Sequence, residues 1–252
     1  MSENQPPVGP ARPPEVVELL PGRLHLLRFV VGQAYLWSDE GELTLIDTGP
    51  ADAARGMAEA VTALGHSLAE LRRIVLTHFH EDHVGGAAEL ARRTGARVYA
   101  QPRDAVFVRG ERPGPPPVYE EWEVPIHQHA KSLLPDHAPA PVPADALEEI
   151  GHGDVLDFGG GARIVGAPGH TDGSVAVHLP RHGVLFTGDA IAASPEDGQV
   201  MLGVFNLDRR RAIASFRELA ALEPHMACFG HGDPVLHDAG TALRAAAGRY
   251  EN

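Results

Sequence analysis

The segment THFHEDHVGG, at residues 77–86, is the feature that most restricts how this chain can fold. It continues an apolar, strand-like run at 72–78 and supplies four side chains of a type that can bind metal: His78, His80, Asp82 and His83. A turn at the end of a strand can direct several side chains into one cavity, whereas a regular strand alternates them between two faces. Imidazole and carboxylate groups bind zinc, iron and manganese. Because four such groups are more than one tetrahedral ion needs from a local segment, the segment predicts a site for two ions. The alternative is a polar surface turn in a histidine-rich chain.

Three further residues of metal-binding type follow apolar runs in the second half of the chain. His170 follows ARIVGAPG, Asp189 ends GVLFTGD and His231 lies in MACFGHG. Each stands next to a glycine, which allows close backbone packing. Each also has an ordinary alternative, because an aspartate can cap a helix and a histidine can lie in a turn. Because all three residues follow an apolar run and stand next to a glycine, we favour a metal site that they share.

Strand-like and helical runs alternate in both halves of the chain. We expect strands at 23–30, 34–39, 42–49, 72–78, 96–101, 154–169 (a hairpin), 174–180, 183–189 and 226–232. We expect helices at 51–64, about 83–93, 208–222 and 238–248, where apolar residues recur at helical spacing. This alternation predicts an α/β protein with sheets covered by helices. Residues 1–14 are predicted to be a flexible N-terminal arm, and residues 15–252 a single domain.

The stretch at about 102–150 is predicted to be an insertion that acts as a lid over a substrate site. It contains a long proline-rich part with little periodicity, and such loops in compact domains are usually functional or disordered. Tyr119, Trp122 and Ile126 are the predicted apolar lining of this lid. His127 and His129 form a His-x-His pair that is either a third metal site or a solvated part of the loop.

Composition excludes several classes of partner. The formal net charge is −13, which argues against nucleic acid and against anionic membrane surfaces, because lysine and arginine supply affinity for phosphates. No apolar run is long enough to span a membrane, and the polar start is no secretory signal. The single cysteine, Cys228, allows no internal disulfide and is expected in the core. We therefore expect a cytoplasmic protein that acts on a small molecule. The sequence gives no indication of oligomeric state.

The ordered set His-x-His-x-Asp-His, His, Asp and His resembles the metallo-β-lactamase superfamily of hydrolases, and its glyoxalase II or lactonase-like branch in particular. The resemblance covers about residues 23–235 and includes LIDTG at 45–49. It implies the four-layer αββα sandwich of that superfamily. It also implies one metal ion on His78, His80 and His170, a second on Asp82, His83 and His231, and Asp189 bridging the two. Asp47, in LIDTG, would support a metal ligand without contacting the metal itself.

The resemblance further implies two divalent ions per chain, with zinc favoured and iron or manganese as alternatives. Such a centre would cleave an ester, lactone or thioester by attack of a hydroxide that bridges the metals, with Asp82 accepting or relaying a proton. Acyl-homoserine lactonases carry a tyrosine where this chain has Ala192, and glyoxalase II enzymes continue into a glutathione-binding region for which few residues remain after His231. The substrate is therefore expected to differ from both.

Three other functions remain open from the sequence. The first is a mononuclear iron oxidoreductase similar to persulfide dioxygenases, which would use His78, His170 and Asp189. β-Lactam hydrolysis is less favoured, since the common zinc β-lactamases have a cysteine at the position of Asp189. A non-catalytic metal-binding module is also less favoured, because an open-sided two-metal site is an inefficient way to stabilise a fold.

Overall fold

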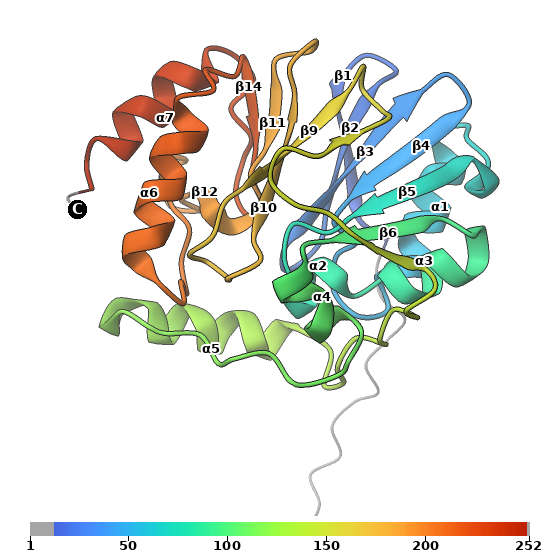
Figure 1. Cartoon of the computed structure of the whole chain (residues 1–252), viewed down its shortest axis with the longest axis horizontal. Helices are drawn as coiled ribbons and strands as arrows, with labels where there is room; N and C mark the ends of the chain where they lie inside the picture. Colours follow the sequence, from blue (N-terminus) through green and yellow to red (C-terminus); the bar gives the residue numbers. More distant parts are fainter. Residues whose placement is uncertain (1–12, 251–252) are drawn as a thin grey trace, which may run out of the picture.

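The computed structural model describes residues 13–250, which form two facing β-sheets enclosed by helices. Helices α6 (Arg209–Ala220) and α7 (Ala239–Ala247) lie on one side, and α1 (Ala53–Ala63) and α3 (Ala87–Thr94) lie on the other, with the sheets between them (Figure 1). Three apolar clusters fill the spaces between these layers. The order helix, sheet, sheet, helix is the predicted αββα sandwich.

In the described part of the chain the larger sheet has seven strands, ordered as they occur in the sequence. They are β1 (Glu15–Leu20), β2 (Leu24–Arg28), β3 (Gln33–Asp39), β4 (Glu42–Ile46), β5 (Leu71–Val75), β6 (Arg97–Ala100) and β7 (Leu147–Glu149). Neighbours from β1 to β4 are antiparallel, and those from β4 to β7 are parallel. The parallel pairs need crossover connections, and those from β4 to β5 and from β5 to β6 contain α1 and α3.

The smaller sheet, counted over residues 13–250, has five strands in the order β14-β11-β10-β9-β8. They are β8 (Val155–Leu156), β9 (Ala162–Gly166), β10 (Val175–Leu179), β11 (Val184–Phe186) and β14 (Met226–Cys228). Strands β9 and β11 are both antiparallel to β10, and β14 is parallel to β11. The carboxyl ends of β9, β11 and β14 therefore lie at the same edge of the sheet. Strands β12 (Ile191–Ala193) and β13 (Val200–Leu202) form a separate pair.

Alternation of side chains along each strand explains why both faces of each sheet are buried. In β4, Leu43 and Leu45 belong to the cluster that contains residues of α1 and α3, whereas Ile46 belongs to the cluster between the sheets. On the far side, Leu185 of β11 shares a cluster with Phe216 of α6. Sheets packed on both faces provide a rigid base for the loops that follow their strands.

The structure corrects the prediction of a single helix at about 83–93. Two helices, α2 (Glu81–Val84) and α3, replace it, separated by Gly85 and Gly86. A Cβ atom on Gly85 would lie only 1.9 Å from the carbonyl carbon of Pro50, so this close backbone contact requires glycine at the break.

Strands β1, β12 and β13 were also not expected from the sequence. No residue of β1 is buried, so its sequence lacks a clear inward-facing pattern. Strands β12 and β13 contain three residues each, which is too short for a recognisable alternation.

The stretch at about 102–150 is more ordered than the predicted insertion. Its two ends belong to the sandwich, because α4 (Pro102–Val108) follows β6 directly and β7 pairs with β6. Between them lie the 3-10 helix η2 (Glu121–Glu123) and α5 (Val124–Leu133). Helix α5 lies at the end of the molecule where α2 and α4 lie (Figure 1). It has no buried residue, which explains why the sequence showed no apolar periodicity there.

The predicted arm at residues 1–14 lies outside the described residues except for its last two prolines. Of these, Pro14 is buried and Pro13 is exposed, and they lead directly into β1. Within residues 13–250, no helix combines the length and the apolar character needed to cross a membrane.

Candidate metal centre

One edge of the sandwich gathers the segments that follow β5, β9, β11 and β14, and so draws on both sheets. These segments carry all seven predicted ligands: His78, His80, Asp82, His83, His170, Asp189 and His231. They fall into three overlapping groups, in each of which the ligand atoms lie within 4.8 Å of one another. The groups are His78, His80 and His170; His78, His83 and Asp189; and Asp82, His83 and His231. The first and third match the two ligand sets implied by the resemblance.

The first group is a cluster of three imidazoles. The Nδ1 atom of His80 lies 3.1 Å from Nε2 of His78 and 2.9 Å from Nε2 of His170. His170 Nδ1 is 3.0 Å from the carbonyl oxygen of Val204, so this nitrogen donates its proton there and Nε2 keeps a lone pair. The Thr77 hydroxyl donates to the Asp47 carboxylate and therefore accepts from His78 Nδ1 at 3.0 Å. Both Nε2 atoms thus present lone pairs to the same point.

The third group, Asp82, His83 and His231, combines imidazoles with a carboxylate. Asp82 Oδ2 lies 3.6 Å from Nε2 of His83 and 3.2 Å from Nε2 of His231. Asp189, a member of the second group, lies between the first group and the third. Its Oδ1 atom is 3.3 Å from His83 Nε2, while its Oδ2 atom is 3.2 Å from His231 Nε2 and 3.7 Å from His170 Nε2. This is the position that a shared carboxylate ligand requires.

The donor atoms of this cluster fit divalent ions. His80 Nδ1 faces the lone pairs of His78 Nε2 and His170 Nε2, and a single N–H on His80 cannot donate to both. The buried atoms His83 Nε2 and Asp189 Oδ1 have no hydrogen-bond partner among the described residues. With the imidazole neutral and its proton on Nδ1 toward Asp47, both atoms are acceptors, and buried acceptors that face each other need a proton or a metal ion between them. Imidazole and carboxylate ligands suit zinc, and also iron and manganese.

Electrostatics separate the two halves of the cluster. Burial, together with the neighbouring His170, lowers the pKa of His80 to about 3, and burial also lowers the pKa of His78 and His170. These three imidazoles therefore stay neutral and keep their lone pairs at neutral pH. Burial also disfavours a charge on His231, but Asp189 and Asp82 outweigh it and raise the pKa of His231 to about 10. The carboxylates thus make the second half a region that attracts positive charge.

Asp47 occupies the supporting position that the resemblance implies. Its Oδ2 atom lies 2.9 Å from His83 Nδ1 and accepts the Thr77 hydroxyl proton at 2.7 Å. Its Oδ1 atom accepts the Thr77 backbone N–H at 2.8 Å. The buried carboxylate therefore orients His83 directly and His78 through Thr77. Asp47 has a φ of 61°, an uncommon backbone conformation for a residue other than glycine.

Gly230 shows why glycine stands next to a ligand at the end of β14. A Cβ atom at this position would lie 1.9 Å from Asp189 Oδ1 and 2.8 Å from His83 Cε1. Any side chain would therefore occupy the space in which two predicted ligands meet.

Sequence reasoning missed Asp104, a buried carboxylate on α4. Its Oδ2 atom accepts the Phe79 backbone N–H at 3.1 Å and the Thr171 hydroxyl proton at 2.7 Å. Its Oδ1 atom accepts the Gly173 backbone N–H at 2.9 Å. Asp104 therefore joins the loop of His78 and His80 to the loop of His170. Burial raises the pKa of Asp104 to about 6, so it is mainly ionised at neutral pH. An acid at the third position of a short helix gave no signal in the sequence.

A cavity of about 720 Å³ opens at the cluster, and His80, Asp82, Asp189 and His231 form part of its wall. The structure corrects the predicted lining of the lid, because Tyr119, Trp122 and Ile126 are exposed and are not among the residues that line this cavity. Residues of α5 and its C-terminal end line it instead: His127, Ala130, Lys131 and Leu134. Their spacing is that of one helical face, which an interpretation of this segment as a loop could not reveal.

His127 contacts aromatic groups in this wall. Its Nδ1 atom lies 3.1 Å from the Tyr119 hydroxyl, and its ring centroid is 5.2 Å from that of Phe205. Among the described residues, neither His127 nor His129 belongs to a group with metal-binding geometry. The third metal site considered from the His-x-His pair therefore has no support from the geometry.

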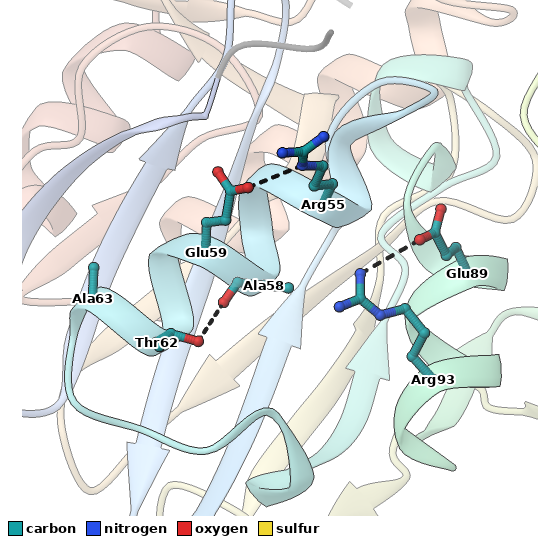
Figure 2. Close-up of a pocket in the computed structure, with 7 residues that line it drawn as sticks. All are labelled: Arg55, Ala58, Glu59, Thr62, Ala63, Glu89 and Arg93. Atoms are coloured by element: carbon teal, nitrogen blue, oxygen red, sulfur yellow. Dashed lines mark hydrogen bonds and ion pairs between the residues drawn. The ribbon is translucent and has the colours of Figure 1, made fainter.

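A second hollow, of about 710 Å³, lies between α1 and α3 (Figure 2). Its charged side chains pair along their own helices, Arg55 with Glu59 and Arg93 with Glu89 (Figure 2). None of the residues that line it is a predicted ligand. It is a surface groove with ordinary helical ion pairs, and it carries no site.

Comparison with known proteins places the chain in a family. A family model described as the metallo-beta-lactamase superfamily matches residues 27–231. The chain belongs to this superfamily. Its fold agrees with a solved metallo-beta-lactamase family protein from Thermus thermophilus, which is 25% identical with a TM-score of 0.64, over 92% of this chain and 80% of that one.

Relatives in the superfamily are named as hydrolases. "Probable metallo-hydrolase YybB" from Bacillus subtilis (strain 168) is 26% identical over 200 residues, which cover 79% of this chain and 80% of that protein. A hydroxyacylglutathione hydrolase from Cereibacter sphaeroides (strain ATCC 17029 / ATH 2.4.9) is 34% identical over 166 residues, or 64% of this chain. The match spans about half of that relative, 48% of its length. A metal-binding hydrolase of this superfamily is therefore the general class of the protein.

Proposed function

We propose that this protein is a dinuclear metal-dependent hydrolase that cleaves an ester, lactone or thioester bond in a small molecule. The observation that carries the proposal is the position of Asp189, whose two carboxylate oxygens face both ligand groups at 3.2–3.7 Å. A carboxylate so placed is suited to two ions, one on His78, His80 and His170 and one on Asp82, His83 and His231. Zinc is the favoured metal, with iron and manganese as alternatives.

Bound divalent ions would supply a hydroxide nucleophile at neutral pH and would polarise the bond under attack. The chain's own residues supply the surroundings of that chemistry. Asp82 lines the cavity, and although burial opposes its charge, His83 and His231 hold its pKa below the usual range. It is therefore an ionised carboxylate in the cavity wall, which can accept a hydrogen bond and relay a proton, although its lowered pKa makes it a weak base.

Among the described residues that line the cavity, none is a cysteine, serine or threonine that could serve as a nucleophile. Cys228 is fully buried within the core between the two sheets, where burial raises the pKa of its thiol. It remains protonated and lies outside the cavity wall. The same single cysteine allows no internal disulfide, which fits the cytoplasmic location that we propose.

The choice of bond rests on the relatives and on the cavity. Relatives named hydroxyacylglutathione hydrolases match much of this chain, which favours acyl transfer to water. The cavity volume of about 720 Å³ lies within the range of small-molecule sites. Its wall contains Phe79, Phe107 and Phe205, which suit an apolar part of a substrate.

The test combines metal content with a substrate panel. Protein prepared with zinc, manganese or iron should contain about two ions per chain by elemental analysis and should hydrolyse at least one member of a panel of esters, lactones, thioesters and β-lactams. Asp189→Ala should lose metal and turnover together, whereas Asp157→Asn, on an exposed loop, should retain both. Metal-free protein after such preparation, or full turnover by Asp189→Ala, would refute the proposal. Sulfide- or persulfide-dependent oxygen uptake by protein with one iron bound would instead support the mononuclear iron oxidoreductase.

A further inference from the structure

We propose that Arg112 is an anion-binding subsite in the wall of this cavity, so that the preferred substrate carries a carboxylate or phosphate group away from the bond that is cleaved. This inference rests on the proposed function, because it concerns the substrate class of the same site. It follows from the charges of the cavity wall and from a smaller hollow that adjoins the cavity at Arg112.

Arg112 has no acidic partner in the part of the chain that the structure describes. No carboxylate oxygen there lies within 4.0 Å of its guanidinium nitrogens, although the chain has an excess of acidic residues. Its guanidinium carbon lies 5.1 Å from the centroid of the Phe107 ring. A guanidinium stacked on a ring keeps its N–H edge available, and this edge matches the two oxygens of a carboxylate or phosphate.

The other charged groups of the cavity wall already have partners. Lys131 pairs with Glu81, and both side chains line the cavity. The acidic residues Asp82 and Asp189 belong to the metal centre, where His231 contacts both. Arg112 is therefore the one charged group in this wall, among the described residues, that lacks a counter-charge.

The space beside Arg112 extends beyond the main cavity. A neighbouring hollow, of about 400 Å³, shares Phe79, Phe107, Arg112 and Pro115 with the wall of the main cavity. Its wall also contains Arg103 and Asp172, which approach each other to 4.0 Å. Because Asp172 is held at 2.5 Å by Arg211, Arg103 reinforces the positive charge of this region.

The apolar residues of the cavity wall define the substrate further. Phe79, Val108 and Leu134 lie in the wall that also holds the metal ligands and Arg112. A substrate that fits this wall has a scissile carbonyl at the metal centre, an apolar part and an anionic group at Arg112. The anion belongs either to the acyl part or to the leaving group.

The first experiment measures binding without turnover. Calorimetry on zinc-loaded protein would compare dicarboxylates, from succinate to sebacate, with monocarboxylates of the same chain length. Both kinds of ligand have one carboxylate that can reach the metal centre. The second carboxylate, which only the dicarboxylate has, therefore reports on Arg112. We expect the best dicarboxylate to bind about tenfold more tightly than its partner, as one charge-assisted contact allows. Arg112→Ala should remove this advantage and Arg112→Lys should restore part of it, whereas Arg92→Ala, on the exposed face of α3, should keep it.

The second experiment identifies the source of the anion. Thioesters with a carboxylate at the end of the acyl chain, thioesters of a carboxylate-bearing thiol and neutral analogues of both would be compared by kcat/KM. We expect one charged series to exceed its neutral analogue about tenfold through a lower KM, with the ratio falling to about one in Arg112→Ala.

The outcomes separate this inference from the proposed function. Hydrolysis of neutral and charged thioesters at equal rates, or an equal advantage of dicarboxylates in Arg112→Ala, would refute the subsite and leave the hydrolase intact. Absence of hydrolysis throughout the panel would refute the hydrolase, and the binding experiment would still decide whether Arg112 holds an anion.

Discussion

At the scale of single residues, the centre depends on hydrogen bonds on the sides of the imidazoles that face away from it. His83, His78 and His170 each use Nδ1 for an oxygen partner, which leaves Nε2 directed at the cluster. Such partners set the orientation and basicity of ligands, and their loss commonly costs tenfold or more in metal affinity. Asp47 orients two of these three imidazoles, His83 directly and His78 through Thr77.

Asp47→Asn is expected to weaken metal binding while the protein stays folded. The amide keeps the size of the side chain but replaces one carboxylate oxygen with an NH₂ group, which cannot accept from His83 Nδ1 or the Thr77 hydroxyl. We expect metal affinity to fall about 10- to 100-fold, measured by competition with a chromogenic chelator. Asp157→Asn, which makes the same chemical change on an exposed loop, is the control. Equal affinities of Asp47→Asn and the wild type would show that Asp47 does not support the centre.

Gly230→Ala is expected to remove metal binding through steric conflict alone. The new methyl group would overlap Asp189 Oδ1 at 1.9 Å, so the carboxylate or the strand end must move. We expect less than half of the wild-type metal content by elemental analysis. Gly151→Ala is the matched control, because nothing lies within 4 Å of a Cβ atom there. Unchanged metal content in Gly230→Ala would mean that the ligands do not meet at this point.

At the scale of elements, α4 links two loops that are far apart in the sequence. Its Asp104 accepts hydrogen bonds from Phe79, between two ligands of the β5 loop, and from Thr171, next to His170. Helix α4 thereby holds the three imidazoles of the first group in one arrangement. Asp82, His83 and His231 have no contact with this carboxylate in the described hydrogen bonds.

Asp104→Asn is therefore expected to affect the two metal positions unequally. Loss of a charged acceptor should cost about 1–3 kcal/mol of unfolding free energy and should loosen the position on His78, His80 and His170 first. Titration with cobalt, followed by its visible spectrum, should show one ion bound as in the wild type and one bound at least tenfold more weakly. Glu89→Gln, at an exposed ion pair of α3, is the control. Equal weakening of both ions would indicate general destabilisation rather than a link to one group.

At the scale of the whole molecule, the centre joins the two sheets. Four predicted ligands follow β5 of the larger sheet, and the other three follow β9, β11 and β14 of the smaller one. An ion bound by ligands from both sheets would oppose their separation. Binding to the folded state alone should therefore stabilise the entire sandwich.

Removal of metal is expected to lower the melting temperature of the whole domain. Free metal at about a thousand times Kd contributes about 4 kcal/mol, which corresponds to roughly 10 °C for a domain of this size. Calorimetry of protein treated with a chelator should show this loss, and added zinc should reverse it. Added magnesium is the control, since it favours oxygen ligands over imidazole. Identical melting with and without zinc would contradict a link between the sheets.

The sequence by itself determined the residue types of the centre and the strands that carry them. His78, His80, Asp82 and His83 stand close together in the chain, and a strand followed by a turn leaves them few other arrangements. The apolar alternation of the main strands also predicted the layers, because it reflects burial on two faces. The sequence did not indicate α5, because its partners are distant in the chain and none of its residues is buried.

Only the tertiary structure decided which of these residues meet. The parallel arrangement of β11 and β14, and the direction of β9, bring Asp189, His231 and His170 to the ligands that follow β5. The same packing placed Asp104 between two ligand loops and left Arg112 without an acidic partner among the described residues. These relations depend on distances between segments that are remote in the chain, and local periodicity and spacing carry no information about such distances.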